Sequence, residues 1–216
     1  MPVKAIPAED ADFERIFEIT SLAFDRNEPV WDAMWPSHWL PQGRQQGAER
    51  MRKTKNTTPE TTYIKAIDTE TGKILGMAKW NIFQNYSPSR SEVPDIYENN
   101  QDRDYAQGVV DAFLATRNQA IKERDGNVIA LDILTVDPAY QRQKVGSCLV
   151  EWGTRKADEM GFDAVVESSV FGRGLYEKHG FEYQNDVQVT VPGYENDASR
   201  PTGSFAWMVR PKTTKA

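Results

Sequence analysis

The sequence predicts a single α/β (α+β) domain, in which helices pack against a central sheet of mixed strand direction. The chain has 216 residues, which suffices for one sizeable domain and is too short for two ordinary ones. Two strand-like segments, 61–68 and 73–83, flank a short polar turn and predict a hairpin. Strand and helix patterns then alternate towards the C-terminus, which is typical of this fold class. The prediction is one domain over residues 1–216.

The composition limits the classes of protein to which the chain can belong. Hydrophobic residues make up 39% of the chain and charged residues 27%, which excludes global disorder. The formal net charge of −6 argues against nucleic acid as a partner, and no apolar run is long enough to span a membrane. The single cysteine, Cys148, excludes an internal disulfide, and the first ten residues lack a secretory signal pattern. These features predict a cytoplasmic protein.

The N-terminal part begins with a strand at 3–6 and a helix at about 10–24. Mostly apolar side chains recur along this helix at three- and four-residue spacing, which is typical of a buried helical face. The side chains on this face are Phe13, Ile16, Phe17, Thr20 and Phe24. A segment rich in Trp and Pro follows the helix, and a polar, basic helix is predicted at 42–55.

Two features of this region have more than one interpretation. Trp31, Trp35 and Trp39 have four-residue spacing, so a short helix would place them on one face. They form either a wall for a bound acceptor or a satellite hydrophobic cluster. The basic residues of the segment 44–55 either attract an anionic group or form a solvated helix face.

The second half of the chain contains the longest predicted loop and the most apolar predicted strand. Residues 87–104 contain two prolines and two adjacent asparagines, which predicts the loop. The segment 127–136 is almost continuously apolar, which is typical of a strand buried on both faces. The other predicted elements are helices at 105–124, 145–160 and 172–179 and strands at 164–167, 181–191 and 204–209. Gly161 is a typical C-terminal cap for the second of these helices.

A polar loop at 141–144 joins the buried strand to the helix that begins near Val145. The N-terminus of a helix offers unpaired N–H groups and the positive end of the helix dipole, which suits a phosphate or pyrophosphate. Gly146 lets the backbone approach such an anion closely, and Arg142 and Lys144 add positive charge. The motif G-x-x-x-x-G-K-S/T is absent, and so is G-x-G-x-x-G after a strand.

Two motifs in this region give the sequence a specific resemblance. Residues 141–146, QRQKVG, follow a Val-x-Pro turn and match the pattern Gln/Arg-x-x-Gly-x-Gly/Ala in register except at Lys144. Residues 175–181, LYEKHGF, place Leu-Tyr on a short helix and Gly-Phe at the start of a strand. The region resembles the acetyl-CoA-binding core of the GNAT superfamily of N-acetyltransferases. Lys144 stands where that family has its first motif glycine, so its side chain either crowds the phosphates or binds them.

The resemblance implies a mostly antiparallel, twisted sheet that is splayed at the cofactor-binding strand, with acetyl-CoA as the acyl donor. It implies no metal, and no cluster of Cys, His and Asp has the spacing of a metal site. Main-chain contacts to the pantetheine arm are implied for Leu134, Thr135 and Val136. A pyrophosphate site is implied for Gln141, Arg142, Gln143, Lys144, Val145, Gly146 and Ser147, and a polar contact near the arm for Ser169.

The resemblance also assigns the general acid. Tyr176 corresponds to the family's usual tyrosine beside the thioester sulfur, although a tyrosine packed on the sheet is the alternative. Asp132 and Glu167 are both candidates for the general base, and each is alternatively an ion-paired structural carboxylate. Strand alternation predicts that Asp132 and Leu134 share a face. A mechanism without a single base stays open.

The expected function is transfer of an acetyl group from acetyl-CoA to a primary amine in one ternary complex, without an acyl-enzyme. Cys148 is interpreted as a buried, inert thiol rather than a nucleophile. The expected acceptor is a small molecule, with a peptide amine as the alternative, and the protein is expected to be a monomer or homodimer. Segments 25–60 and 85–125 are the expected variable segments on the acceptor side. The alternative function is a CoA-binding or sensing protein of the same fold without transferase activity.

Overall fold

The structure is a computed structural model that describes residues 1–25, 28–200 and 203–213. Its strands are β1 (Val3–Pro7), β2 (Thr61–Asp68), β3 (Ile74–Phe83), β4 (Val128–Val136), β5 (Asp163–Ser168), β6 (Glu182–Val189) and β7 (Gly203–Arg210). Its α-helices are α1 (Phe13–Phe24), α2 (Pro29–Met34), α3 (Pro41–Thr57), α4 (Asn100–Glu123), α5 (Val145–Met160) and α6 (Arg173–Glu177). Two short 3₁₀ turns, η1 (Asp10–Asp12) and η2 (Pro138–Tyr140), precede α1 and follow β4. Among the described residues, no helix is both long enough and apolar enough to cross a membrane.

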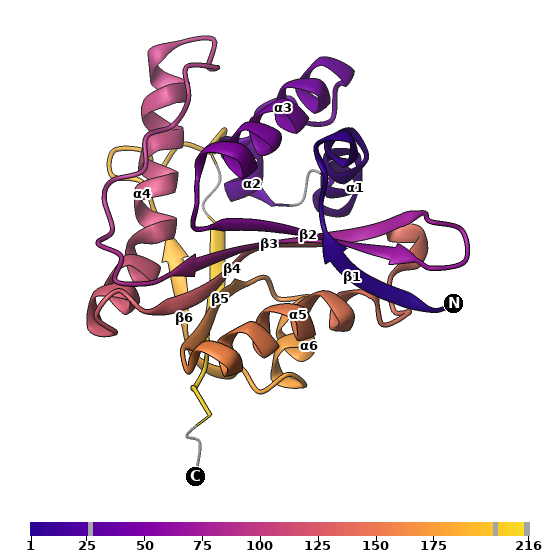
Figure 1. The fold of residues 1–216 in the computed structure, drawn as a ribbon. Helices are drawn as coiled ribbons and strands as arrows, with labels where there is room; N and C mark the ends of the chain where they lie inside the picture. Colours follow the sequence, from indigo (N-terminus) through magenta and orange to yellow (C-terminus); the bar gives the residue numbers. More distant parts are fainter. Residues whose placement is uncertain (26–27, 201–202, 214–216) are drawn as a thin grey trace.

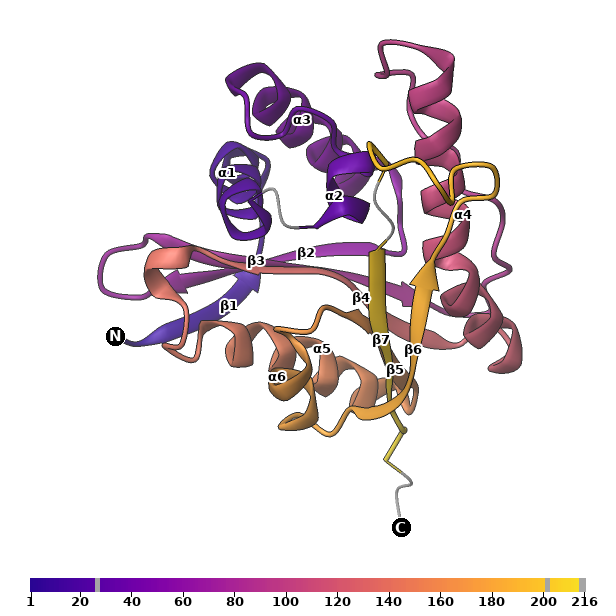
Figure 2. The same cartoon turned by 180° about the vertical axis from the view of Figure 1, so that it is seen from behind.

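The seven strands form one sheet in the order β1-β2-β3-β4-β5-β7-β6. Only β4 and β5 pair in parallel, and the other neighbours are antiparallel. Helices α1, α2 and α3 cover one face of the sheet, and α5 and α6 cover the other (Figure 1). Helix α4 stands beside the β6 end of the molecule, as the view from behind also shows (Figure 2). The mixed, mostly antiparallel sheet flanked by helices confirms the predicted fold class.

Strand β4 lies at the centre of the core because its side chains are apolar on both faces. Ile129 and Leu131 are buried in the cluster on the α5 side of the sheet. Val128 and Ala130 are buried in the cluster that α4 covers. The predicted helix at 145–160 coincides with α5, and Gly161 ends it in the left-handed conformation with φ of 68°. These two predictions are confirmed. Both depend on residues that are close in the sequence, so no knowledge of the tertiary structure was needed.

Helix α4 begins at Asn100 rather than at residue 105, so the predicted start of this helix is wrong by five residues. The side chain of Asn99 accepts a hydrogen bond from the backbone N–H of Asp102 at 2.8 Å and caps the helix. The first turn is polar and has no apolar periodicity, so only this cap could have indicated it. The predicted loop at 87–104 therefore ends at residue 99, because its last five residues belong to α4.

The three tryptophans do not lie on one helical face, so that prediction is wrong. Helix α2 ends at Met34, and Trp35 has φ of −131° and ψ of 65°. Trp35 precedes Pro36, whose ring disfavours helical geometry in the preceding residue. Trp31 and Trp35 still stack, with ring centroids 5.0 Å apart, whereas Trp39 packs edge-on against His38.

Candidate active site

Strands β4 and β5 separate along their length and open the sheet. Their parallel pairing runs from Val128–Asp163 to Leu131–Val166 and stops there. Strand β4 continues to Val136, and its other edge stays paired with β3 throughout. Backbone groups of β4 beyond Leu131 therefore face an opening rather than a neighbouring strand. Such an edge can pair with an extended ligand in the manner of an added strand.

A β-bulge lies at the point where the strands part. Lys79 of β3 is opposite Ile133, and Trp80 is opposite Leu131, so Asp132 is the extra residue of the bulge. Asp132 contacts Arg117 of α4, whereas Leu134 packs against the core on the α5 side. The expectation that Asp132 and Leu134 share a face is therefore wrong. An inserted residue shifts the alternation of side chains along a strand, and the sequence pattern does not show the insertion.

The opening between the strands leads into a cavity of about 310 Å³. Five of the predicted site residues line it: Asp132, Leu134, Glu167, Ser169 and Tyr176. The other lining residues come from α1, α2, α3, α4, the loop at 91–94, β7 and the residues next to these elements, and include Phe24, Trp31, Trp35, Val93, Phe113 and Phe205. The other predicted residues, Thr135, Val136 and those at 141–147, do not line this cavity. Catalytic candidates and both variable segments thus meet around one space.

Tyr176 is buried in the wall of the cavity. It is 7% exposed and packs edge-to-face on Phe181, with ring centroids 5.7 Å apart. A Cβ at Gly172 would lie 2.8 Å from the Tyr176 ring, so glycine leaves room for the ring there. Burial raises the pKa of Tyr176, which keeps the hydroxyl protonated at neutral pH. Within the described residues the hydroxyl makes no hydrogen bond, so it is available to a ligand in the cavity.

The two carboxylates belong to a buried ion-pair cluster. Arg117, which is 3% exposed, pairs with both Asp132 and Glu167, and Lys79 Nζ lies 2.7 Å from Asp132 Oδ2. Burial opposes ionisation of Asp132, but Lys79 and Arg117 outweigh it and hold the pKa of Asp132 below its usual range. Burial raises the pKa of Glu167, whose side chain is 1% exposed, and Arg117 only partly opposes this. The carboxylate with two cations is the weaker base.

Sequence reasoning missed Arg117 and Lys79 because it assigned no role to cations near the carboxylates. Arg117 lies on the inward face of α4, three and four residues before the buried Ala120 and Ile121. A cation on a buried apolar face must pair with an acid, so this position was a signal for a partner carboxylate. Which acid it meets depends on the packing of α4 against the sheet.

The predicted pyrophosphate loop lies at the N-terminus of α5, which begins at Val145. Arg142 and Lys144 both have left-handed backbones, with φ of 62° and 67°. Successive N–H groups in such a turn, followed by the first turn of a helix, form an anion-binding concavity. The first turn of α5 contains no acidic residue. These local features suit a phosphate group.

Gly146 has a packing role that the sequence did not indicate. A Cβ at this position would lie 3.1 Å from Leu175 Cδ2. Gly146 therefore allows α5 and α6 to approach each other, and α6 contains Tyr176. The two sequence motifs are in direct contact at this point, which the sequence alone did not show.

Lys144→Gly is expected to raise the free energy of unfolding by about 1 kcal/mol. A non-glycine residue in the left-handed region costs roughly 1–2 kcal/mol, part of which glycine's greater chain entropy offsets. Urea unfolding monitored by tryptophan fluorescence measures the change. The control is Lys178→Gly at the C-cap of α6, a right-handed position with φ of −63°, where glycine only adds entropy to the unfolded chain and should lower stability by about 0.4–1 kcal/mol. A loss of stability in Lys144→Gly would contradict the strain argument.

The comparisons with known proteins agree with this geometry. The model of the acetyltransferase (GNAT) family matches residues 27–181. The chain belongs to the acetyltransferase (GNAT) family, as the resemblance of its two motifs predicted. No curated protein matches the sequence.

Solved structures of acetyltransferases share the fold at low sequence identity. Arylalkylamine N-acetyltransferase 2 from Aedes aegypti is 16% identical, with a TM-score of 0.65 over 98% of this chain and 99% of that one. A phosphinothricin acetyltransferase from Sinorhizobium meliloti in complex with AcCoA is 16% identical, with a TM-score of 0.57 over 100% and 93%. The PaiA N-acetyltransferase from Thermoplasma acidophilum in complex with coenzyme A is 12% identical, with a TM-score of 0.55 over 99% and 100%.

Proposed function

We propose that the protein transfers an acetyl group from acetyl-CoA to a primary amine of a small molecule, by direct transfer in a ternary complex. The observation that supports this most is the opening between β4 and β5, which leads into a cavity beside the unbonded hydroxyl of Tyr176. A strand edge, a proton donor and an enclosed space meet there. The strand edge can hold the donor, the hydroxyl can protonate the departing thiolate, and the enclosed space can hold the amine.

The donor would lie along the open edge of β4 with its phosphates at the start of α5. Backbone groups of Leu134, Thr135 and Val136 would bind the pantetheine arm, and Ser169 lies across the opening on the β5 side. The loop at 141–147 would bind the pyrophosphate through N–H groups. Two of the solved structures with this fold contain CoA or AcCoA, which supports the same donor here.

Tyr176 would act as the general acid. As the amine nitrogen bonds to the acyl carbon, the carbon–sulfur bond breaks and the departing thiolate needs a proton or a strong hydrogen bond. The Tyr176 hydroxyl is protonated and unbonded, so it can donate to the sulfur. Backbone N–H groups at the bulge around Asp132 can polarise the acyl oxygen.

Asp132 and Glu167 would attract and orient the amine rather than act as strong bases. Both carboxylates line the cavity, and both are already paired with Arg117. The low pKa of Asp132 makes it a weak proton acceptor, and Glu167 is the better candidate if a side chain removes the proton. Cys148 does not line the cavity, and burial raises the pKa of its thiol, which argues against an acyl-enzyme.

A small acceptor suits the cavity better than a peptide. Segments 25–60 and 85–125 supply Trp31, Trp35, Val93 and Phe113 to the wall opposite the sheet. The volume of about 310 Å³ is that of a small-molecule site. A peptide amine would need an open groove along the surface.

The alternative proposal is a CoA-binding or sensing protein without transferase activity. Lys144 motivates this alternative, because a residue with a side chain and a left-handed backbone (φ of 67°) occupies the position where the family has glycine. Both proposals need the donor to bind, and only the first needs turnover.

Calorimetry with acetyl-CoA, and with CoA, ATP and NAD as controls, tests the donor site. We expect selective binding of acetyl-CoA and CoA. Released thiol, measured over a set of amines, then tests transfer. Binding without thiol release for any amine supports the sensing protein, and absence of binding by the folded protein contradicts both proposals.

A further inference from the structure

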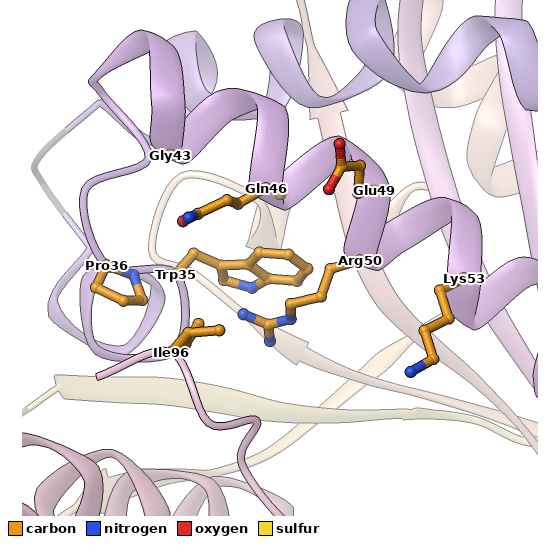
Figure 3. Close-up of a pocket in the computed structure, with 9 residues that line it drawn as sticks. Trp35, Pro36, Gly43, Gln46, Glu49, Arg50, Lys53 and Ile96 are labelled. Carbon is orange, nitrogen blue, oxygen red and sulfur yellow. The ribbon is translucent and has the colours of Figure 1, made fainter. Parts of the chain in front are cut away.

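Arg50 lies between two cavities, and this position suggests a role in acceptor choice. It belongs to α3 and lines both the cavity that contains Tyr176 and an outer cavity of about 270 Å³. Figure 3 shows the outer cavity, with the Arg50 side chain running beneath the indole of Trp35. The guanidinium carbon lies 3.6 Å from the Trp35 ring centroid. Trp35 also lines both cavities, so this stacked pair separates them.

The Arg50 guanidinium has no ionic partner within the described residues. Its Nη1 donates a hydrogen bond to the backbone oxygen of Met34 at 2.8 Å, which leaves Nε and Nη2 without a protein acceptor. Burial lowers the pKa of Arg50. The neighbouring Glu49 carboxylate points away from it in Figure 3. Lys79, the other cation of the inner cavity, is paired with Asp132. Arg50 is thus a half-buried cation with two donor nitrogens that no acceptor of the described residues occupies.

The free donors of Arg50 are suited to a carboxylate. A planar guanidinium binds a carboxylate or phosphate through two parallel hydrogen bonds, and desolvation strengthens them. Four carboxylates line the inner cavity: Glu28, Glu92, Asp132 and Glu167. Arg117 and Lys79 pair with Asp132 and Glu167, whereas Glu28 has no ion pair within the described residues. The carboxylates of Glu28 and Glu92, unpaired within the described part of the chain, repel a doubly charged phosphate more strongly than a singly charged carboxylate, so a carboxylate is the favoured anion.

We propose that Arg50 binds a carboxylate of the acceptor, so that the preferred acceptors are amines that also bear a carboxylate, as amino acids do. This inference rests on the proposed acetyltransferase function. The amine end would lie near Asp132, Glu167 and Tyr176, and the carboxylate end against Arg50. The aromatic wall of Trp31 and Trp35 would contact the part between them.

Matched pairs of acceptors test this inference. Each pair has an amino acid and the amine that lacks its carboxylate, such as phenylalanine with phenethylamine and γ-aminobutyrate with propylamine. A series of ω-amino acids of increasing chain length measures the distance between the position of the amine and the position of the carboxylate in the cavity. We expect the wild-type protein to have the higher kcat/KM for the acid in at least one pair. Arg50→Met should lower the ratio of kcat/KM for the acid to kcat/KM for the matched amine by about 100-fold, mainly through KM for the acid, because a charge-assisted pair is lost. Arg50→Lys should lower it less.

The control variant is Lys53→Met, which removes a cation from the same helix that lines only the outer cavity. It should leave the ratio unchanged. A wild-type preference for the amine lacking the carboxylate in every pair would overturn the inference. An equal loss for both members of a pair in Arg50→Met would also overturn it, because that is the effect of a structural role.

Failure of the proposed function gives a different result, namely no thiol release with any amine. The same acids can then be titrated by tryptophan fluorescence, since Trp35 contacts Arg50. Binding that Arg50→Met abolishes and Lys53→Met retains supports the carboxylate site without turnover. Equal binding, or none, in the wild-type protein and Arg50→Met contradicts it.

Discussion

Tyr176→Phe is expected to lower kcat by about 10²- to 10⁴-fold, the usual contribution of a positioned general acid. Tyr176 lines the cavity and its hydroxyl makes no hydrogen bond within the described residues, so loss of the hydroxyl removes a donor without leaving a buried partner unsatisfied. The Kd for acetyl-CoA should not change, because the ring and its packing on Phe181 remain. Single-turnover kinetics and calorimetry measure the two quantities.

Tyr183→Phe is the matched control for this variant. Tyr183 lies on β6, is 38% exposed and does not line the cavity, so its kcat should equal that of the wild-type protein. Burial raises the pKa of Tyr176, so the acid should stay protonated, and kcat should show no alkaline loss from it below pH about 10. Unchanged turnover in Tyr176→Phe would remove this residue from the mechanism.

Arg117→Met is expected to lower the free energy of unfolding by about 3–5 kcal/mol, the usual cost of breaking a buried ion pair. Arg117 pairs with Asp132 and Glu167, and the Glu167 side chain is 1% exposed. Asp132 keeps Lys79 as a partner, whereas Glu167 would be left as an uncompensated buried charge. Urea unfolding gives the change, and turnover should fall with it because both carboxylates line the cavity.

Two further variants separate the ion pair from general damage to α4. Arg117→Met combined with Glu167→Gln should recover much of the lost stability, because no isolated charge remains. Arg124→Met removes a more exposed arginine that follows the same helix and pairs with Asp163, so it should cost about 1 kcal/mol or less. Equal losses in Arg117→Met and Arg124→Met would contradict the assigned role.

The pH dependence of the Arg117→Met variant has a defined sign. Burial already raises the pKa of Glu167 in the folded protein, and loss of Arg117 removes the attraction that opposes this. The folded variant would therefore bind a proton more readily than the unfolded chain. Its stability relative to the wild-type protein should improve as the pH falls through the range in which Glu167 titrates.

Local patterns in the sequence were enough to predict most elements and both motifs. The apolar run of β4 and the periodic face of α5 each reflect the burial of neighbouring residues, so they are visible without tertiary information. The motifs at 141–146 and 175–181 are contiguous stretches at the ends of these elements, so they too can be recognised from the sequence. The start of α4 was missed because a polar first turn has no periodicity and only the cap at Asn99 indicates it.

The site itself was predicted only in part. Sequence reasoning placed Tyr176, Asp132 and Glu167 in one region, and the structure brings all three to one cavity. Their catalytic roles stay predictions. The bulge at Asp132 could not be predicted because it is defined by the pairing register of β4 against β3, which the sequence of β4 alone does not show. The bulge places Leu134 on the opposite face of the strand from Asp132, although both residues line the cavity.

The sequence by itself determined the fold class, the order of the elements and the family motifs, because each depends on patterns among residues that are close along the chain. Only the tertiary structure decided that Arg117 pairs with both carboxylates and that Arg50 has no ionic partner within the described residues. The physical reason is that a charge's protonation and role depend on burial and on the partner that packing brings to it. Residues 117, 132 and 167 lie on separate elements and pair only after the chain has folded, and residue 50 reaches the same cavity as residues 132 and 167 from a fourth element.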